Sequence, residues 1–227
     1  MGMKPSFRIR GLWIRGALMV IAFLHPPAPA IGAEDDSWPS SVLKFSAGVA
    51  ASALIHEGAH ALTAWATGTA MTWEVGSYNQ PVGFTERAGS NSKGVALYSS
   101  GLFSQAIGGE VLLRWDRIDK NDNFIRGMMT WDVVNPLLYS LDYWFFRRTN
   151  KKDGNSYQGD LQGIEHYSNK TTANVIAASF SAIAVFQAYR FLQTQEWAPE
   201  WLKGETSRLG FRPLHPEGFM MTYHFRF

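Results

Sequence analysis

Two histidines, His56 and His60, flank a glutamate in the sequence His-Glu-Gly-Ala-His, and this HExxH pattern is the part of the chain best suited to chemistry. Helical residues four positions apart share one face, so both imidazoles can bind the same metal ion. Glu57 then stands where it can act as a general base toward a water molecule that the metal activates. The pattern therefore predicts a zinc site that hydrolyses peptide bonds. A chance match, with two buried histidines satisfied by polar neighbours, is the alternative.

A catalytic zinc site needs a third protein ligand, and the absence of cysteine leaves only His, Asp and Glu to provide it. The candidates are carboxylates that lie in or beside predicted helices, namely Glu110, Asp142 and Asp160. Glu110 could instead pair with Arg114, which lies one helical turn further on. Asp142 could instead pair with Arg147 or Arg148. Asp160 comes after Gly159, and a Gly-Asp step is also common where a helix begins.

Four apolar, helix-forming stretches are expected to position these residues. They cover approximately residues 40–67, 95–115, 124–146 and 172–192. Alternating segments at 71–78 and 82–85 predict short strands, and the alternation at 219–227 predicts an edge strand. The expected fold is mainly α with short β segments. It is a bundle of about four helices with HExxH on the first and a small strand-rich insert between the first two.

The predicted helices have the length of membrane spans, near 20 residues. Charged residues interrupt them, and the mean hydropathy of the whole chain is slightly negative, so a soluble periplasmic domain is the alternative. The basic cluster at 147–152 faces the cytoplasm by the positive-inside rule, which agrees with an exported chain that crosses the membrane four times. We therefore expect a membrane-embedded bundle.

The N-terminus has the features of an export signal. A basic beginning, a short apolar run and small residues up to Ala33 predict a signal peptide over residues 1–33, with an uncleaved anchor as the alternative. Residues 34–227 then form one helical domain, with a core at 40–192 and a C-terminal tail at 193–227. The expected location is a bacterial cell envelope, at the inner membrane or else in the periplasm. A net charge of +2 without a basic stripe makes nucleic acid a poor partner.

Taken together, these features resemble the site-2 protease family of intramembrane zinc metalloproteases. The shared order is HExxH, a strand-rich segment, a helix beginning with small residues near Ser100-Gly101, and an Asp from a later helix. Asn135-Pro136 followed by Leu141-Asp142 is similar to that family's Asn-Pro and Leu-Asp-Gly motif, although the spacing differs by one residue and Tyr143 replaces the Gly. Gly159-Asp160 is similar to the pair of a small residue and an Asp that precedes the last helix in a more divergent branch of the same family. The resemblance spans approximately residues 42–189, and HExxH is its one specific motif.

The resemblance implies that His56, His60 and one Asp bind Zn²⁺ while Glu57 acts as the general base. We rank Asp160 first as the third ligand, then Asp142, then Glu110. The implied substrate is a peptide or protein in or beside the membrane, and Asn135 would orient the substrate or its oxyanion. The competing hypotheses are a non-catalytic metal-binding or structural envelope protein and a soluble periplasmic zinc peptidase.

Overall fold

The computed structural model is mainly helical. It describes residues 37–73, 82–146, 152–153, 156–157, 159–200, 202–203, 209–214 and 218–223. The predicted signal peptide, residues 74–78 of the predicted first strand, residues 79–81 and residues 147–151 of the basic cluster lie outside these ranges.

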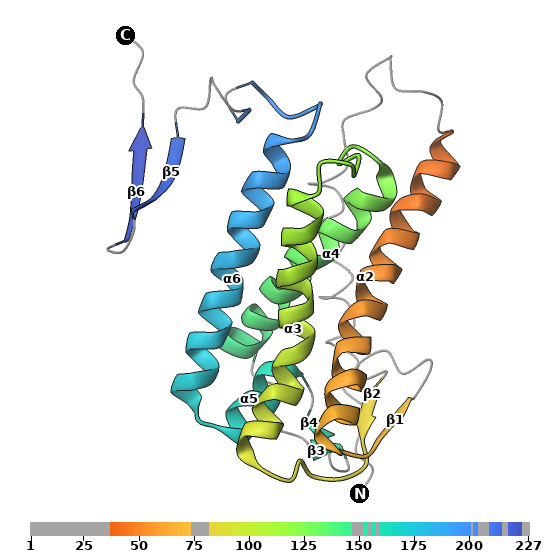
Figure 1. Cartoon of the computed structure of the whole chain (residues 1–227), viewed down its shortest axis with the longest axis vertical. Coiled ribbons are helices and arrows are strands. Elements are labelled where there is room, and N and C mark those ends of the chain that lie inside the picture. Colours follow the sequence, from red (N-terminus) through yellow and green to blue (C-terminus); the bar gives the residue numbers. More distant parts are fainter. Residues whose placement is uncertain are drawn as a thin grey trace, which may run out of the picture. The chain divides into compact units, whose positions relative to one another are not determined.

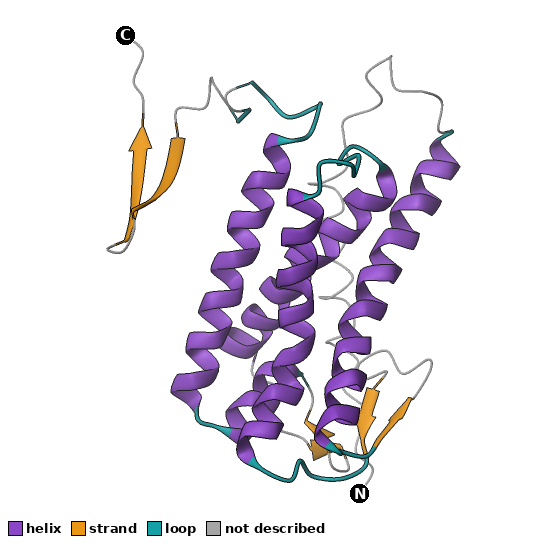
Figure 2. Ribbon diagram, in the orientation of Figure 1, coloured by secondary structure: helices purple, strands orange, loops and turns teal. Residues whose placement is uncertain are grey.

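Helices make up most of the described chain, as Figure 2 shows. They are α2 (Trp38–Thr67), α3 (Asn91–Arg114), α4 (Asn123–Leu141), α5 (Asp160–Tyr167) and α6 (Lys170–Gln193), and a π-helical turn, η1 (Asp142–Phe146), continues α4 (Figure 1). The four longer helices coincide with the four predicted stretches to within a few residues at each end. The short helix α5 is an element that the sequence patterns do not predict.

The described strands form three separate antiparallel pairs. These are β1 (Met71–Trp73) with β2 (Val82–Phe84), β3 (Lys152–Asp153) with β4 (Ser156–Tyr157), and β5 (Leu209–Leu214) with β6 (Gly218–Tyr223). The first pair is the strand-rich insert expected between the first two long helices. The predicted C-terminal edge strand corresponds to β6, which pairs with the unpredicted strand β5.

Polar side chains and one glycine fix where the long helices begin and end. At the starts of α3, α4 and α6, side-chain oxygens accept hydrogen bonds from backbone N–H groups of the first turn; the residues that provide them are Ser90, Asp122 and Asn169. Helix α2 stops at Gly68, whose φ of +69° suits glycine. Thr69 N then donates to the Ala64 carbonyl oxygen at 2.9 Å.

Helices α2 and α4 pack with their backbones in contact. A Cβ added at Gly48 would lie 2.0 Å from the carbonyl oxygen of Phe124, and one added at Gly127 would lie 2.1 Å from that of Phe45. Each glycine therefore provides the space that the other helix fills. Small residues at such crossings let helices approach closely, as in membrane-embedded bundles.

Helix α5 packs against α3 through two reciprocal contacts between a tyrosine and a glycine. The Tyr98 ring covers Gly163 of α5, and the Tyr167 ring covers Gly94 of α3, with both rings within 2.3 Å of the position of an added Cβ. The two rings stack at 5.9 Å between centroids. Tyr167 Oη also accepts a hydrogen bond from Ala88 N at 3.1 Å, so α5 is fixed from both sides.

The buried and exposed faces of α2 are the reverse of those of a water-soluble amphipathic helix. Its buried residues, spaced four apart, are Gly48, Ser52, His56, His60 and Ala64. Large apolar side chains face outward instead: Leu54 and Leu62 are each 64 % exposed and Trp65 is 80 % exposed. By length and composition, one described helix, α6, qualifies as a candidate membrane span. A bundle with four membrane spans therefore remains a proposal.

Candidate metal centre

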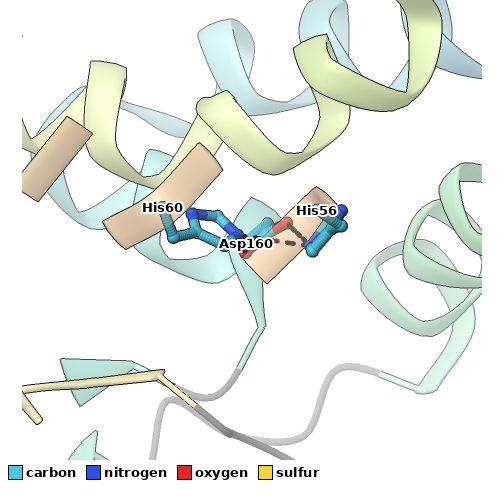
Figure 3. Close-up of side chains that lie close together, drawn as sticks. All are labelled: His56, His60 and Asp160. Atoms are coloured by element: carbon cyan, nitrogen blue, oxygen red, sulfur yellow. Dashed lines mark hydrogen bonds and ion pairs between the residues drawn. The ribbon is translucent and has the colours of Figure 1, made fainter. Parts of the chain in front are cut away.

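Three predicted ligands from two helices converge on one point. His56 and His60 come from α2, and Asp160 is the first residue of α5 (Figure 3). His56 Nε2 lies 3.3 Å from Asp160 Oδ2, and His60 Nε2 lies 3.3 Å from Asp160 Oδ1. The two Nε2 atoms are 3.2 Å apart. Across the described ranges, these residues are the one group of three that could hold a metal ion.

All three side chains are buried: His56 is 2 % exposed, His60 5 % and Asp160 6 %. Burial alone would raise the pKa of the Asp160 carboxyl, but the imidazoles of His60 and His56 hold that pKa below its ordinary value. Asp160 Oδ2 accepts no hydrogen bond from the described part of the chain. A cation beside this buried carboxylate oxygen would stabilise it, whether a protonated His56 imidazole at 3.3 Å or a metal ion.

His60 is oriented by a backbone carbonyl. Its Nδ1 lies 2.8 Å from Leu97 O, and because a carbonyl oxygen can only accept, Nδ1 must donate. Ser100 Oγ lies 3.2 Å from the same nitrogen and itself donates to Leu97 O. In the neutral ring, Nε2 is therefore unprotonated, with its lone pair toward Asp160 and His56. Metal-binding histidines are typically held in this way.

His56 is oriented by an amide side chain instead. Its Nδ1 donates to Gln105 Oε1 at 3.1 Å, and the same oxygen accepts from Asn135 Nδ2 at 3.0 Å. Gln105 Nε2 donates to the Trp131 carbonyl oxygen at 3.3 Å, which fixes the amide orientation. His56 Nε2 is thus also unprotonated in the neutral ring and faces the Asp160 carboxylate.

Lone pairs on two imidazole nitrogens and two carboxylate oxygens therefore meet in a buried space. While both imidazoles are neutral these atoms repel one another. A proton on an Nε2 atom relieves that repulsion, and so does a metal ion that accepts a lone pair from each ligand. The donor set of two histidines and one carboxylate fits a divalent metal. The three residues could therefore bind a metal ion.

Two glycines make room for this arrangement. A Cβ on Gly101 of α3 would lie 2.5 Å from His56 Nε2 and 2.6 Å from His60 Nε2, so any side chain there would displace the imidazoles. Gly159, just before Asp160, has a φ of +92°, a conformation that L-residues with a side chain rarely adopt. The first glycine lets α3 approach the histidines, and the second turns the chain into α5.

Two further side chains border the group. Glu57 is half-buried, and the charges of His56, His60 and Asp160 act on its carboxyl. Tyr139 of α4 stacks on His56, with 6.0 Å between ring centroids and an angle of 11° between the planes. The carboxylate of Glu57 and the phenol ring of Tyr139 therefore lie beside the possible metal position.

The other two candidate ligands lie outside the group. Asp142 begins η1 and accepts a hydrogen bond from Gln162 Nε2 at 3.4 Å. Glu110 accepts from Arg190 Nη1 at 2.7 Å and also pairs with Arg114, the alternative partner that the sequence offered. Neither carboxylate belongs to the group formed with His56 and His60, and each has other partners.

The sequence patterns missed three parts of the site: the Leu97 carbonyl, Gln105 and Tyr139. A backbone carbonyl leaves no trace in side-chain types. Gln105 did carry a signal, since it lies four residues after Gly101 on the same helical face and is a polar residue between the apolar residues Phe103 and Ile107. Tyr139 likewise lies four residues after Asn135.

Comparison of the chain with protein-family models, with curated proteins and with solved structures gave no match.

Proposed function

We propose that this protein is a zinc-dependent peptidase that cleaves peptide bonds in or beside the bacterial inner membrane. The observation that carries the proposal is the meeting of His56, His60 and Asp160, with both Nδ1 atoms engaged by oxygen acceptors. An HExxH helix that brings a third ligand to its two histidines, with a carboxylate beside them, has the parts that zinc-dependent hydrolysis requires. The resemblance to the site-2 protease family agrees with this assignment.

Each residue has a definite task in the proposed reaction. His56 Nε2, His60 Nε2 and an oxygen of Asp160 would hold Zn²⁺, which supplies Lewis-acid polarisation of the scissile carbonyl and lowers the pKa of a water molecule. The Glu57 carboxylate accepts the proton of the attacking water and then gives it to the leaving amine nitrogen. Gln105 Oε1 and Leu97 O accept from the Nδ1 atoms of His56 and His60, and so keep the two imidazoles in the tautomer whose Nε2 can bind the metal.

The distribution of polar and apolar side chains supports the membrane part of the proposal. Large apolar residues point outward from the long helices, for example Phe103 and Ile107 of α3, which are 54 % and 61 % exposed. Polar residues such as Ser52 and Gln105 are buried in the bundle instead. In lipid this arrangement is favourable, because the outer face needs no water and the polar groups satisfy one another inside.

The test of the metal site compares the proposed ligands with the two excluded carboxylates. The full-length protein, purified in detergent, should contain about one zinc per chain by elemental analysis. Asp160→Asn and His60→Ala should lose most of it, while Asp142→Asn and Glu110→Gln should retain it. Loss of zinc in Asp142→Asn but not in Asp160→Asn would reverse the assignment. Iron instead of zinc would change the proposed chemistry, because ferrous iron also accepts two histidines and a carboxylate.

The test of catalysis separates an enzyme from a metal-binding structural protein. Glu57→Gln should keep the zinc content of the wild type and lose hydrolysis of membrane peptides, because the amide cannot accept the proton. Membranes that contain wild type or Glu57→Gln should then differ in their peptide fragments by mass spectrometry. Identical fragment patterns from the two membranes would exclude the peptidase and favour a structural role.

A further inference from the structure

We propose that Tyr139 of α4 is a catalytic residue whose hydroxyl donates a hydrogen bond to the substrate carbonyl oxygen as that oxygen gains negative charge. The inference rests on the proposed peptidase function and deepens it. Negative charge that develops on a carbonyl oxygen is best stabilised by donors already in place before the reaction.

Tyr139 lies against the side of the site that α4 forms. Its ring stacks on His56 with 6.0 Å between ring centroids and an angle of 11° between the planes, so the phenol lies over one face of this imidazole. The charges of Asp160, Glu57 and Asp142 all act on the Tyr139 hydroxyl. Within the described ranges, no hydrogen bond from that hydroxyl to another residue is found.

The other polar donors around the histidines are already used. Asn135 shares a face of α4 with Tyr139, and its Nδ2 donates to Gln105 Oε1 at 3.0 Å. Ser100 Oγ donates to the Leu97 carbonyl oxygen at 2.8 Å. The substrate-orienting role that the resemblance implies for Asn135 would break a buried hydrogen bond, whereas no hydrogen bond to a described residue has to break for Tyr139 to take that role.

The approach to the histidines is also closed on the α3 side. The Gly101 backbone is so near that an added Cβ would lie 2.4 Å from His56 Cε1 and 2.6 Å from His60 Nε2. A substrate carbonyl cannot pass between α3 and these rings. It must approach from a side that α3 does not cover, and Tyr139 lines one such side.

The experiment uses Tyr139→Phe, which keeps the ring on His56 and removes only the hydroxyl. Tyr189→Phe is the matched control, since Tyr189 lies on α6 and its hydroxyl accepts from Gln193. Both variants and the wild type are loaded with Co²⁺ in place of zinc and titrated with acetohydroxamate, whose anionic oxygen stands in for the charged carbonyl oxygen. Visible absorption of Co²⁺ reports metal geometry and hydroxamate affinity without any substrate.

We expect Tyr139→Phe to bind one Co²⁺ with the wild-type spectrum and to bind acetohydroxamate about tenfold or more weakly, as loss of a hydrogen bond to a charged oxygen predicts. Tyr189→Phe should match the wild type. Equal hydroxamate affinity in Tyr139→Phe and wild type would overturn this inference but not the proposed function. Loss of Co²⁺ in Tyr139→Phe would do the same, because the hydroxyl would then have a structural role. A wild type that binds no metal overturns the proposed function and this inference with it.

Discussion

At the residue scale, Gln105 connects the metal group to the rest of the bundle. One amide oxygen serves both His56 of α2 and Asn135 of α4, and the amide nitrogen holds a carbonyl of α4. Loss of such a partner usually weakens metal binding, because the imidazole is no longer held in one orientation and tautomer.

Gln105→Leu should therefore weaken zinc binding by about 10- to 100-fold, measured by competition with a chelator. The matched control is Gln187→Leu on α6. Gln187 is another buried glutamine, and its amide nitrogen donates to the Ala106 carbonyl oxygen at 2.7 Å rather than to a histidine. The control should lose stability without losing zinc affinity. Equal zinc affinity in the two variants would mean that Gln105 only fills space.

Gly101 and Gly58 offer a comparison of two helical glycines. Gly101→Ala should abolish stoichiometric zinc binding, because its Cβ would lie 2.5 Å from His56 Nε2. Gly58→Ala, inside the HExxH motif itself, should keep zinc, since nothing lies within 4 Å of an added Cβ. It should also stabilise α2 by up to about 1 kcal/mol through helix propensity. Zinc content and thermal unfolding in detergent measure both effects, and zinc retained in Gly101→Ala would contradict the close approach of α3.

The ligand residues could be predicted better than their surroundings. HExxH predicts His56 and His60, and Asp160 ranks first among three carboxylates; these are the three residues that the structure brings together as a possible metal site. The resemblance ranks Asp160 above Asp142, but the residue types themselves do not separate the two, because the choice depends on where the fold places each carboxylate. The structure pairs Asp142 with Gln162 and leaves Asp160 Oδ2 beside His56.

At the element scale, the contact between α2 and α4 determines where the histidines lie. Gly127→Ala should destabilise the protein by about 1–3 kcal/mol, because the new methyl group would meet the backbone of Phe45 at 2.1 Å and the helices would have to separate. Thermal unfolding in detergent should show a lower midpoint than in Gly58→Ala, which adds the same methyl group to open space. Equal midpoints would argue against backbone contact between the two helices.

The long helices were predictable and α5 was not, for a physical reason. Long apolar runs with polar caps carry their own signal, as Asp122 does ahead of α4. Helix α5 is eight residues long, too short to be stable by itself, and it is held by the rings of Tyr98 and Tyr167. The contacts that stabilise it join residues 65 and 73 positions apart along the chain, which no local pattern reveals.

At the scale of the whole molecule, the outward apolar face gives a test that separates a membrane protein from a soluble one. Val185 lies well inside α6 and is 57 % exposed. In water, Val185→Lys would be nearly neutral, since exposed positions tolerate such changes within about 0.5 kcal/mol. Facing lipid near the middle of a span, the same lysine costs about 2.5–3.5 kcal/mol.

Val185→Lys should therefore lower the amount of protein that resists alkaline carbonate extraction, while Thr171→Lys should not. Thr171 is exposed in the first turn of α6, next to Lys170, where a lysine can reach the membrane surface. The wild type should stay in the carbonate pellet and be released by detergent. If the wild type is extracted by carbonate and both variants fold equally well, the outer face of α6 meets water, and the peptidase proposal would then have to be restated for the periplasm.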